Sequence, residues 1–148
     1  MRPPTTAARS GDAVATAGDP GRLSARPQGV KVLLADDDPH VRSAVRLLLE
    51  DEPGISMVPD CATADGLLER VASSRPDVVL VDWDLPGLRS GGVLPRLRAG
   101  TPSCRVVALS GRPEQRDEAL RLGAVSFVSK GDAPESLLRA LRALRSVR

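Results

Sequence analysis

The sequence predicts an α/β fold in which five parallel strands form a doubly wound sheet. From residue 30 onward, short apolar runs alternate with segments whose apolar residues recur at helical spacing. The runs are continuously apolar and rich in β-branched residues, as expected for strands that are buried on both faces. The expected strands are Val30–Ala35, Ile55–Val58, Val78–Val81, Arg105–Leu109 and Val125–Val128. Five β-α units with right-handed crossovers place helices on both sides of such a sheet.

The helices are predicted from apolar stripes between the strands. The stripes comprise Val41, Val45, Leu48 and Leu49; Leu67, Leu68 and Val71; Val93, Leu94 and Leu97; Ala119, Leu120 and Leu122; and Leu137, Leu138, Leu141 and Leu144. Local signals agree with these positions. Asp38 followed by Pro39 predicts a capped first turn, and Gly123 predicts the end of the fourth helix.

The first 29 residues differ in composition from the rest of the chain. Val14 and Leu23 are their only sizeable apolar side chains, so residues 1–29 are expected to be a disordered extension and residues 30–148 one domain. No apolar stretch resembles a signal-peptide core or approaches the roughly 20 residues of a membrane span. The sequence therefore predicts a soluble cytoplasmic protein without a membrane partner. The net charge of +2 says little about other partners.

Polar side chains follow the apolar runs where chemistry is expected in such a sheet. Asp36 and Asp37 follow the first strand, and Asp82 follows the third. Ser110 and Lys130 follow the fourth and fifth strands. Because the carboxyl ends of parallel strands meet at one edge, we expect these groups to share one crevice. Ionised carboxylates about 4 Å apart repel by about 4 kcal/mol at an effective dielectric constant near 20, so the cluster calls for a cation, a raised pKa, or both.

The residue types favour magnesium and phosphoryl chemistry. Mg²⁺ prefers hard oxygen ligands and uses one or two carboxylates together with phosphate oxygens. Lys130 would supply a positive charge to a phosphoryl group and Ser110 a hydrogen bond. A carboxylate can itself be the nucleophile, which would give an aspartyl phosphate.

Four segments carry a resemblance to a known family. They are residues 32–39, 76–87, 106–111 and 123–130. Together they resemble the receiver domain of two-component response regulators, in the family's order and spacing, from about residue 30 to residue 146. The resemblance implies a flavodoxin-like (βα)5 fold with strand order 2-1-3-4-5, and a receiver domain over residues 30–148.

The resemblance also implies roles for the acidic residues. Asp82 would be the phospho-acceptor. Asp37 and Asp82 would bind Mg²⁺ directly, together with a backbone carbonyl of Trp83 or Asp84, of which the family pattern favours Asp84. Asp36 would act on the metal through a bound water.

A further set of implied roles concerns switching and partners. Ser110 and Phe127 resemble the family's switch pair, in which the hydroxyl moves toward the phosphoryl group and the aromatic ring turns inward. Lys130 is similar to the family's conserved-type lysine. A sensor histidine kinase would donate the phosphoryl group, and the surface of the fourth helix, fifth strand and fifth helix would change its preference for a downstream protein or a second copy of the chain. The resemblance implies a signalling switch rather than an enzyme.

Two departures from the family's pattern bear on these expectations. Gly131 follows the lysine where the family often has proline, which is typical of the subgroup that carries helix-turn-helix output. The chain is therefore expected to be a stand-alone receiver or a regulator whose DNA-binding module is absent from it, with no direct nucleic-acid binding of its own. Trp83 is expected to shield one side of the acceptor.

Two other functions stay open at the level of the sequence. A degenerate receiver would bind partners without being phosphorylated. A haloacid-dehalogenase-type phosphatase is suggested by Asp82-Trp83-Asp84, which imitates that family's Asp-x-Asp motif. In that family the nucleophile strand comes first, whereas here an acidic pair precedes it. Single-site phosphorylation favours the receiver, failure of a small phosphodonor favours the degenerate form, and steady turnover favours the phosphatase.

Overall fold

The computed structural model describes residues 29–146 and contains one five-stranded sheet in these residues. Every neighbouring pair of strands is parallel, in the order β2-β1-β3-β4-β5. The strands are β1 (Val30–Ala35), β2 (Ile55–Met57), β3 (Val78–Asp82), β4 (Arg105–Ser110) and β5 (Ser126–Ser129). The predicted α/β class and strand order are confirmed. The predicted disorder of residues 1–29 falls, apart from Gly29, outside the described residues.

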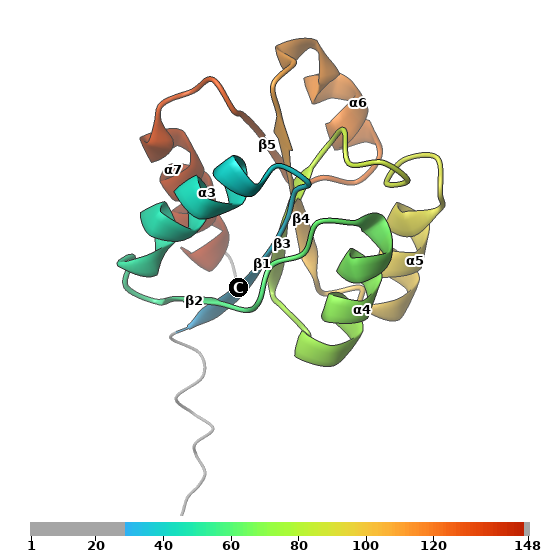
Figure 1. Cartoon of the computed structure of the whole chain (residues 1–148), viewed down its shortest axis with the longest axis horizontal. Coiled ribbons are helices and arrows are strands. Elements are labelled where there is room, and N and C mark those ends of the chain that lie inside the picture. The colour runs from blue at the N-terminus through green and yellow to red at the C-terminus, as the bar shows by residue number, and fades with distance from the viewer. Residues whose placement is uncertain (1–28, 147–148) are drawn as a thin grey trace, which may run out of the picture.

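The helices lie in two layers, one on each face of the sheet. They are α3 (Pro39–Glu50), α4 (Ala64–Ser74), α5 (Val93–Gly100), the 3₁₀ turn η3 (Pro113–Gln115), α6 (Arg116–Arg121) and α7 (Pro134–Ser146). Figure 1 shows α3 and α7 on one side of the sheet and α4, α5 and α6 on the other. This is the doubly wound arrangement that the alternation of strands and helices predicts.

Local signals set the ends of the helices as expected. The Asp38 side chain accepts a hydrogen bond of 2.9 Å from the backbone N–H of His40 and so caps α3, with Pro39 in the first turn. Gly123 has a φ of 113°, a left-handed value that glycine adopts without a steric cost, and it reverses the chain after α6. The predicted helix start and stop at these two points are confirmed.

The alternation of side chains along each strand divides the core into two clusters. Leu33, Ala35 and Phe127 belong to the cluster under α4, α5 and α6, whereas Val32 and Leu34 belong to the cluster under α3 and α7. Most of the apolar strand residues are inaccessible to solvent. Neighbouring residues of one strand therefore serve opposite faces, which decides where each side chain beyond the strand end can point.

The fourth apolar stripe is only partly correct. Ala119 is fully buried, but Leu120 and Leu122 are each 38% exposed. The helix α6 has six residues and follows directly on η3, so its inner side is supplied by Ala119 and the buried Gln115. A two-turn helix presents too little surface to bury three positions of a stripe.

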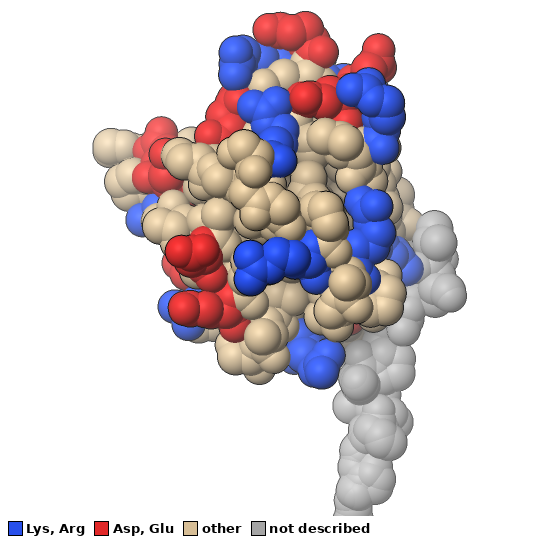
Figure 2. Space-filling model, turned by 90° about the vertical axis from the view of Figure 1, so that its right-hand side faces the viewer, with Lys and Arg blue, Asp and Glu red and all other residues tan. Residues whose placement is uncertain are grey.

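The outer surface over α4, α5 and α6 carries charges of both signs. Figure 2 shows basic and acidic side chains on this face separated by broad uncharged areas. A mixed distribution produces no strong field of one sign over this face. Among the helices of residues 29–146, none combines the length and the apolar character that crossing a bilayer requires.

Candidate functional site

The strand register brings two aspartates side by side. Ala35 of β1 pairs with Val81 of β3, so the next residues, Asp36 and Asp82, lie at the same level on neighbouring strands. By the alternation of side chains both belong to the face covered by α3 and α7. Ser110 of β4 pairs with Ser129 of β5. Lys130 follows this pair by one residue, so by the same alternation it belongs to the face of Asp36 and Asp82. Three charged groups thus meet at the carboxyl edge of the sheet.

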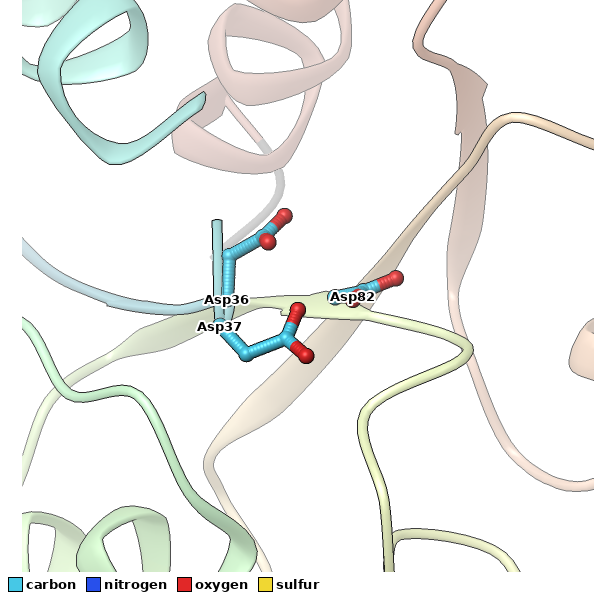
Figure 3. A group of neighbouring side chains, drawn as sticks. All are labelled: Asp36, Asp37 and Asp82. Carbon is cyan, nitrogen blue, oxygen red and sulfur yellow. The ribbon is translucent and has the colours of Figure 1, made fainter. Parts of the chain in front are cut away.

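The structure brings Asp36, Asp37 and Asp82 together at this edge. One carboxylate oxygen of each residue lies within 4.8 Å of the others, and Figure 3 shows the three side chains around one small space. Asp36 is fully buried and Asp82 is 6% exposed, whereas Asp37 is open to solvent. The cluster is therefore accessible from one side only.

Lys130 neutralises part of this negative charge. Its Nζ lies 2.7 Å from Oδ2 of Asp36 and 3.4 Å from Oδ1 of Asp82. Burial alone would lower the pKa of Lys130, but the contacts with these two carboxylates outweigh burial and raise it. The ammonium therefore remains charged at neutral pH and bridges the ends of β1 and β3.

The pKa of Asp82 is raised above its ordinary value. Burial is the main cause, and the nearby charge of Asp36 adds to it. A hydrogen bond of 3.0 Å from the backbone N–H of Asp84 and the proximity of Lys130 act in the opposite direction without cancelling the effect. Lys130 alone thus leaves the cluster with uncompensated negative charge.

The donor set fits a hard divalent cation. Oδ1 of Asp36 accepts a hydrogen bond of 2.9 Å from the backbone N–H of Asp38. Oδ2 of Asp36 is buried without any hydrogen bond, and its partner is the Lys130 ammonium. A buried carboxylate oxygen with spare acceptor capacity, next to two other carboxylates, is suited to Mg²⁺ or to a water bound by it.

Phe127 lies in the core cluster under α4, α5 and α6, and Ser110 ends β4 one residue beyond Leu109, the partner of Asp82 in the sheet. Ser110 is fully buried, its Oγ–H donates to Oε1 of Gln115 at 2.5 Å, and its Oγ accepts from the backbone N–H of Arg112 at 2.9 Å. Phe127 is 8% exposed and packs in the core, with the Arg116 guanidinium 5.9 Å from its ring centroid. The Ser110 hydroxyl is thus directed to the start of α6.

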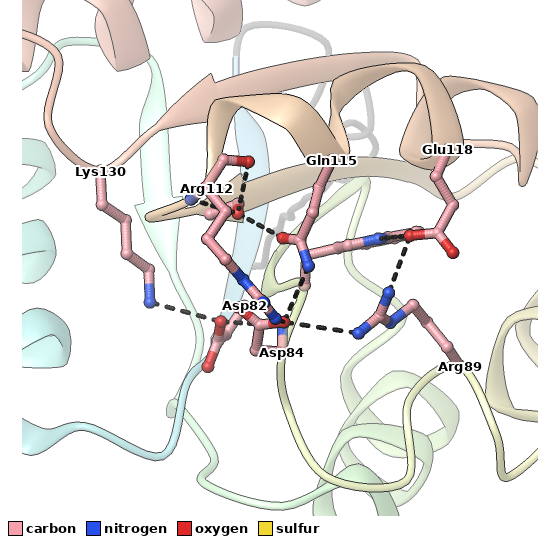
Figure 4. A network of polar contacts seen from close by, with 9 residues as sticks. Asp82, Asp84, Arg89, Arg112, Gln115, Glu118 and Lys130 are labelled. Carbon is pink, nitrogen blue, oxygen red and sulfur yellow. Dashed lines mark hydrogen bonds and ion pairs between the residues drawn. The ribbon is translucent and has the colours of Figure 1, made fainter.

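The Asp84 carboxylate is bound by residues that follow β4. Its Oδ1 accepts from Nη2 of Arg112 at 2.7 Å and from Nε2 of Gln115 at 3.0 Å, and Arg89 lies 3.4 Å away. Figure 4 shows these side chains converging on Asp84. The hydrogen bonds from Arg112 and Gln115 lower the pKa of Asp84. Its side chain is therefore committed to this network, and the role expected for its backbone carbonyl stays a prediction.

Trp83 does not shield the acceptor, and that expectation is wrong. It is fully buried in the cluster under α4, α5 and α6, because the residue after Asp82 continues the alternation of the strand. Its indole N–H donates to Oε1 of Glu118 at 3.1 Å, and the same oxygen accepts from Arg89 at 2.7 Å. These bonds lower the pKa of Glu118. The side chain links the loop after β3 to α6.

No pattern in the sequence singles out Arg89, Arg112, Gln115 or Glu118. Arg112 and Gln115 stand 28 and 31 residues from Asp84, and no local motif pairs them. The one usable signal is that a guanidinium and an amide follow Ser110 within five residues, where the fold brings them to the same edge.

An apolar groove opens beside Lys130 between α3 and α7. It has a volume of about 500 Å³, and its lining includes Val41, Leu48, Val128 and Leu137. Leu47, at its rim, is 70% exposed. Lys130, which contacts Asp36 and Asp82, belongs to the lining of this groove.

Comparison with known proteins identifies the family of this chain. The family model of the response regulator receiver domain matches residues 32–142. The chain belongs to the response regulator receiver domain family. Receiver domains generally bind Mg²⁺ at an acidic pocket, and this chain has an acidic cluster of Asp36, Asp37 and Asp82 that could hold a metal ion.

Relatives and solved structures support the same family. The chain is 34% identical over 112 residues to the nitrate/nitrite response regulator NarL of Escherichia coli K12, covering 74% of this chain and 52% of NarL. It is 29% identical over 119 residues to the response regulator UvrY of the same strain, covering 79% of this chain and 55% of UvrY. The signal receiver domain of a response regulator NarL from Mycobacterium tuberculosis matches with a TM-score of 0.73 and 27% identity, covering 82% of this chain and all of that domain.

These relatives confirm the expected receiver domain and its subgroup. NarL and UvrY are regulators of the type that carries helix-turn-helix output, as the glycine after Lys130 predicts. This receiver chain spans about half the length of these curated relatives.

Proposed function

We propose that this receiver accepts a phosphoryl group on Asp82 from a sensor histidine kinase, with Mg²⁺ as cofactor. The observation that carries the proposal is the placement of Asp82 at the end of β3, next to the carboxylates that follow β1 and 3.4 Å from the ammonium of Lys130. Asp36 is a weaker candidate because it is fully buried and holds Lys130 at 2.7 Å. Asp37 is open to solvent and has no ammonium within ion-pair distance among the contacts of the described residues.

We expect the family's metal ligands at the matching residues of this chain. Asp37 and Asp82 would hold Mg²⁺ directly with the backbone carbonyl of Asp84, and Asp36 would hold one of its waters. When bound, the ion supplies positive charge to the phosphoryl oxygens and offsets repulsion between them and the carboxylates. Lys130 would supply a second positive charge, since its Nζ already lies 3.4 Å from Oδ1 of Asp82.

The transfer itself is a nucleophilic substitution at phosphorus. A carboxylate oxygen of Asp82 attacks the phosphorus atom, the bond between phosphorus and the donor's imidazole nitrogen breaks, and that nitrogen keeps the electron pair. Burial leaves the Asp82 carboxylate poorly solvated, which is also the main reason that its pKa is raised. Burial therefore favours the reaction, because the carboxylate loses charge density when it forms the acyl phosphate. The product places new negative charge near Ser110 and the start of α6.

We expect the new charge to act on Ser110 and Phe127. The Ser110 hydroxyl would donate to the phosphoryl group, and the Phe127 ring would adjust its packing in the space beside Arg116. Phe127 lies in β5, and Ser110 ends β4 and contacts Gln115 at the start of α6, so the surface of α6, β5 and α7 would change its partner preference. The partner would be a downstream protein or a second copy of this chain.

The proposal places this chain in the cytoplasm with protein partners. It would act as a stand-alone receiver or as part of a regulator with a separate DNA-binding module, and would not itself bind nucleic acid or a membrane. The face over α4, α5 and α6 carries charges of both signs, so it lacks the one-signed field that would attract nucleic acid or an anionic membrane (Figure 2).

The direct test is incubation with acetyl phosphate and Mg²⁺, followed by intact mass. We expect one added phosphoryl group per chain, and none when EDTA removes the metal. No modification with either acetyl phosphate or the beryllofluoride mimic would favour a degenerate receiver. Rapid, sustained release of inorganic phosphate from small phosphate esters would favour the phosphatase.

A second expectation concerns Mg²⁺ binding alone. We expect Mg²⁺ to raise the thermal unfolding midpoint of the wild-type protein, because a ligand at ten times its dissociation constant stabilises by about 1.4 kcal/mol. The Asp37→Asn variant should lose most of this stabilisation, since Asp37 is exposed and its loss leaves the packing intact. Asp51→Asn, at the end of α3, is the matched exposed control and should respond like the wild type. Equal responses of all three proteins would contradict the ligand assignment.

A further inference from the structure

We propose that Gln115 is a positioning residue that holds the Ser110 hydroxyl away from Asp82, so that phosphorylation must break this contact to recruit the hydroxyl. The inference rests on the proposed function and deepens it, because it names what opposes the switch. Ser110 is fully buried and Gln115 is 9% exposed, so water does not compete freely for their hydrogen bond.

The Ser110 hydroxyl has one proton to donate. Its Oγ already accepts from the backbone N–H of Arg112, and the proton is directed to Oε1 of Gln115, with the Arg112 carbonyl 3.2 Å away as the alternative acceptor. A phosphoryl oxygen on Asp82 needs this same proton. Donation to the phosphoryl group and donation to Gln115 are therefore mutually exclusive.

Asp84 decides which end of the Gln115 amide faces Ser110. An ionised carboxylate can only accept, so the Gln115 amide nitrogen must point at Asp84, as its 3.0 Å contact requires. The amide oxygen is then left facing Ser110, and the hydroxyl must donate to it. Arg112 reinforces this orientation, because its guanidinium binds the same Asp84 oxygen at 2.7 Å.

The same contact ties the switch to the start of α6. Gln115 ends η3, and one helical turn later Glu118 binds the Trp83 indole at 3.1 Å. Release of Gln115 from Ser110 therefore frees a segment whose next turn contacts Trp83. Because Trp83 is the chain's only tryptophan, its emission reports on this segment without labelling.

The test is a beryllofluoride titration of the full chain at saturating Mg²⁺, followed by Trp83 emission and by the ¹⁹F signal of the bound mimic. We expect Gln115→Leu to bind the mimic about 3- to 10-fold more tightly than the wild type, the range expected for removing one competing neutral hydrogen bond. Gln115→Met, of similar length, is the second variant if Gln115→Leu folds poorly. Glu114→Gln, on the exposed side of the same turn, is the control and should stay within about twofold of wild type.

A double-mutant cycle separates positioning from a merely structural role. In a Ser110→Ala background no hydroxyl proton remains, so Gln115→Leu should no longer change the affinity. A gain that persists in this background, or an unchanged or weakened affinity in the single variants, overturns the inference while leaving the proposed function intact. Failure of the wild type to bind beryllofluoride overturns both.

Discussion

Replacing Asp82 with asparagine is expected to abolish phosphorylation and, in the absence of metal, to raise the thermal unfolding midpoint. Burial raises the pKa of Asp82, so its contribution to stability is complete below its unfolded pKa near 3.9 and is lost as the pH rises through the higher folded value. At pH 7 the ionised side chain therefore opposes folding. Asparagine has the same shape, keeps an oxygen for the Asp84 backbone N–H and removes the charge.

Two assays decide this prediction. Intact mass after acetyl phosphate treatment should show no added phosphoryl group on Asp82→Asn, and Asp82→Ala should behave alike. Thermal unfolding with EDTA at pH 7 should show the higher midpoint for Asp82→Asn, and the difference should shrink as the pH falls toward 4 and Asp82 becomes protonated. Asp51→Asn should match the wild type in both assays. Phosphorylation that survives at Asp82→Asn would show that the acceptor is misassigned, and a lower metal-free midpoint would contradict the argument that the buried Asp82 charge opposes folding.

Replacing Lys130 with methionine is expected to destabilise the metal-free protein by about 2 kcal/mol. Asp36 is fully buried, and removal of its ammonium partner at 2.7 Å leaves that charge without compensation. Breaking a completely buried ion pair costs about 3–5 kcal/mol. The loss expected here is smaller because the Lys130 side chain is 27% exposed. Urea denaturation at pH 7 with EDTA measures the loss. Saturating Mg²⁺ should recover part of it, because the cation replaces the missing positive charge.

The chain supplies its own controls for this substitution. Lys31 is its other lysine, is exposed and donates to the Ser74 carbonyl, so Lys31→Met should cost less than about 1 kcal/mol. Combining Lys130→Met with Asp36→Asn should restore much of the lost stability, because the carboxylate that needs the ammonium is then neutral. Additive losses in the double variant would contradict the pairing of Lys130 with Asp36.

Much of the fold was predictable because its signal is local and repeated. Each strand is an apolar run, and the strand order followed from a resemblance that these runs carry. The strand ends differ by a residue because hydrogen bonding, not apolarity, defines them: Asp82, Ser110 and Ser129 are polar and still complete β3, β4 and β5. The short α6 was the element that the periodic pattern described least well.

The acidic cluster was predictable from topology, whereas the network around Asp84 was not. Parallel strands end at one edge, so Asp36 and Asp82 must meet there whatever their side-chain conformations. The contacts of Asp84 with Arg112 and Gln115 depend on side-chain rotamers across about 30 residues of sequence. The burial of Trp83 was predictable in part, because strand alternation predicts it only once β3 is known to end at Asp82.

The most direct measurement locates the phosphoryl group chemically. Protein treated with acetyl phosphate and Mg²⁺ is reduced with borohydride, which converts an aspartyl phosphate into homoserine, and its peptides are then weighed. We expect homoserine at position 82 and at no other position, and none when EDTA replaces Mg²⁺. Homoserine at position 36 or 37, or a phosphoryl group that borohydride does not remove, would contradict the account.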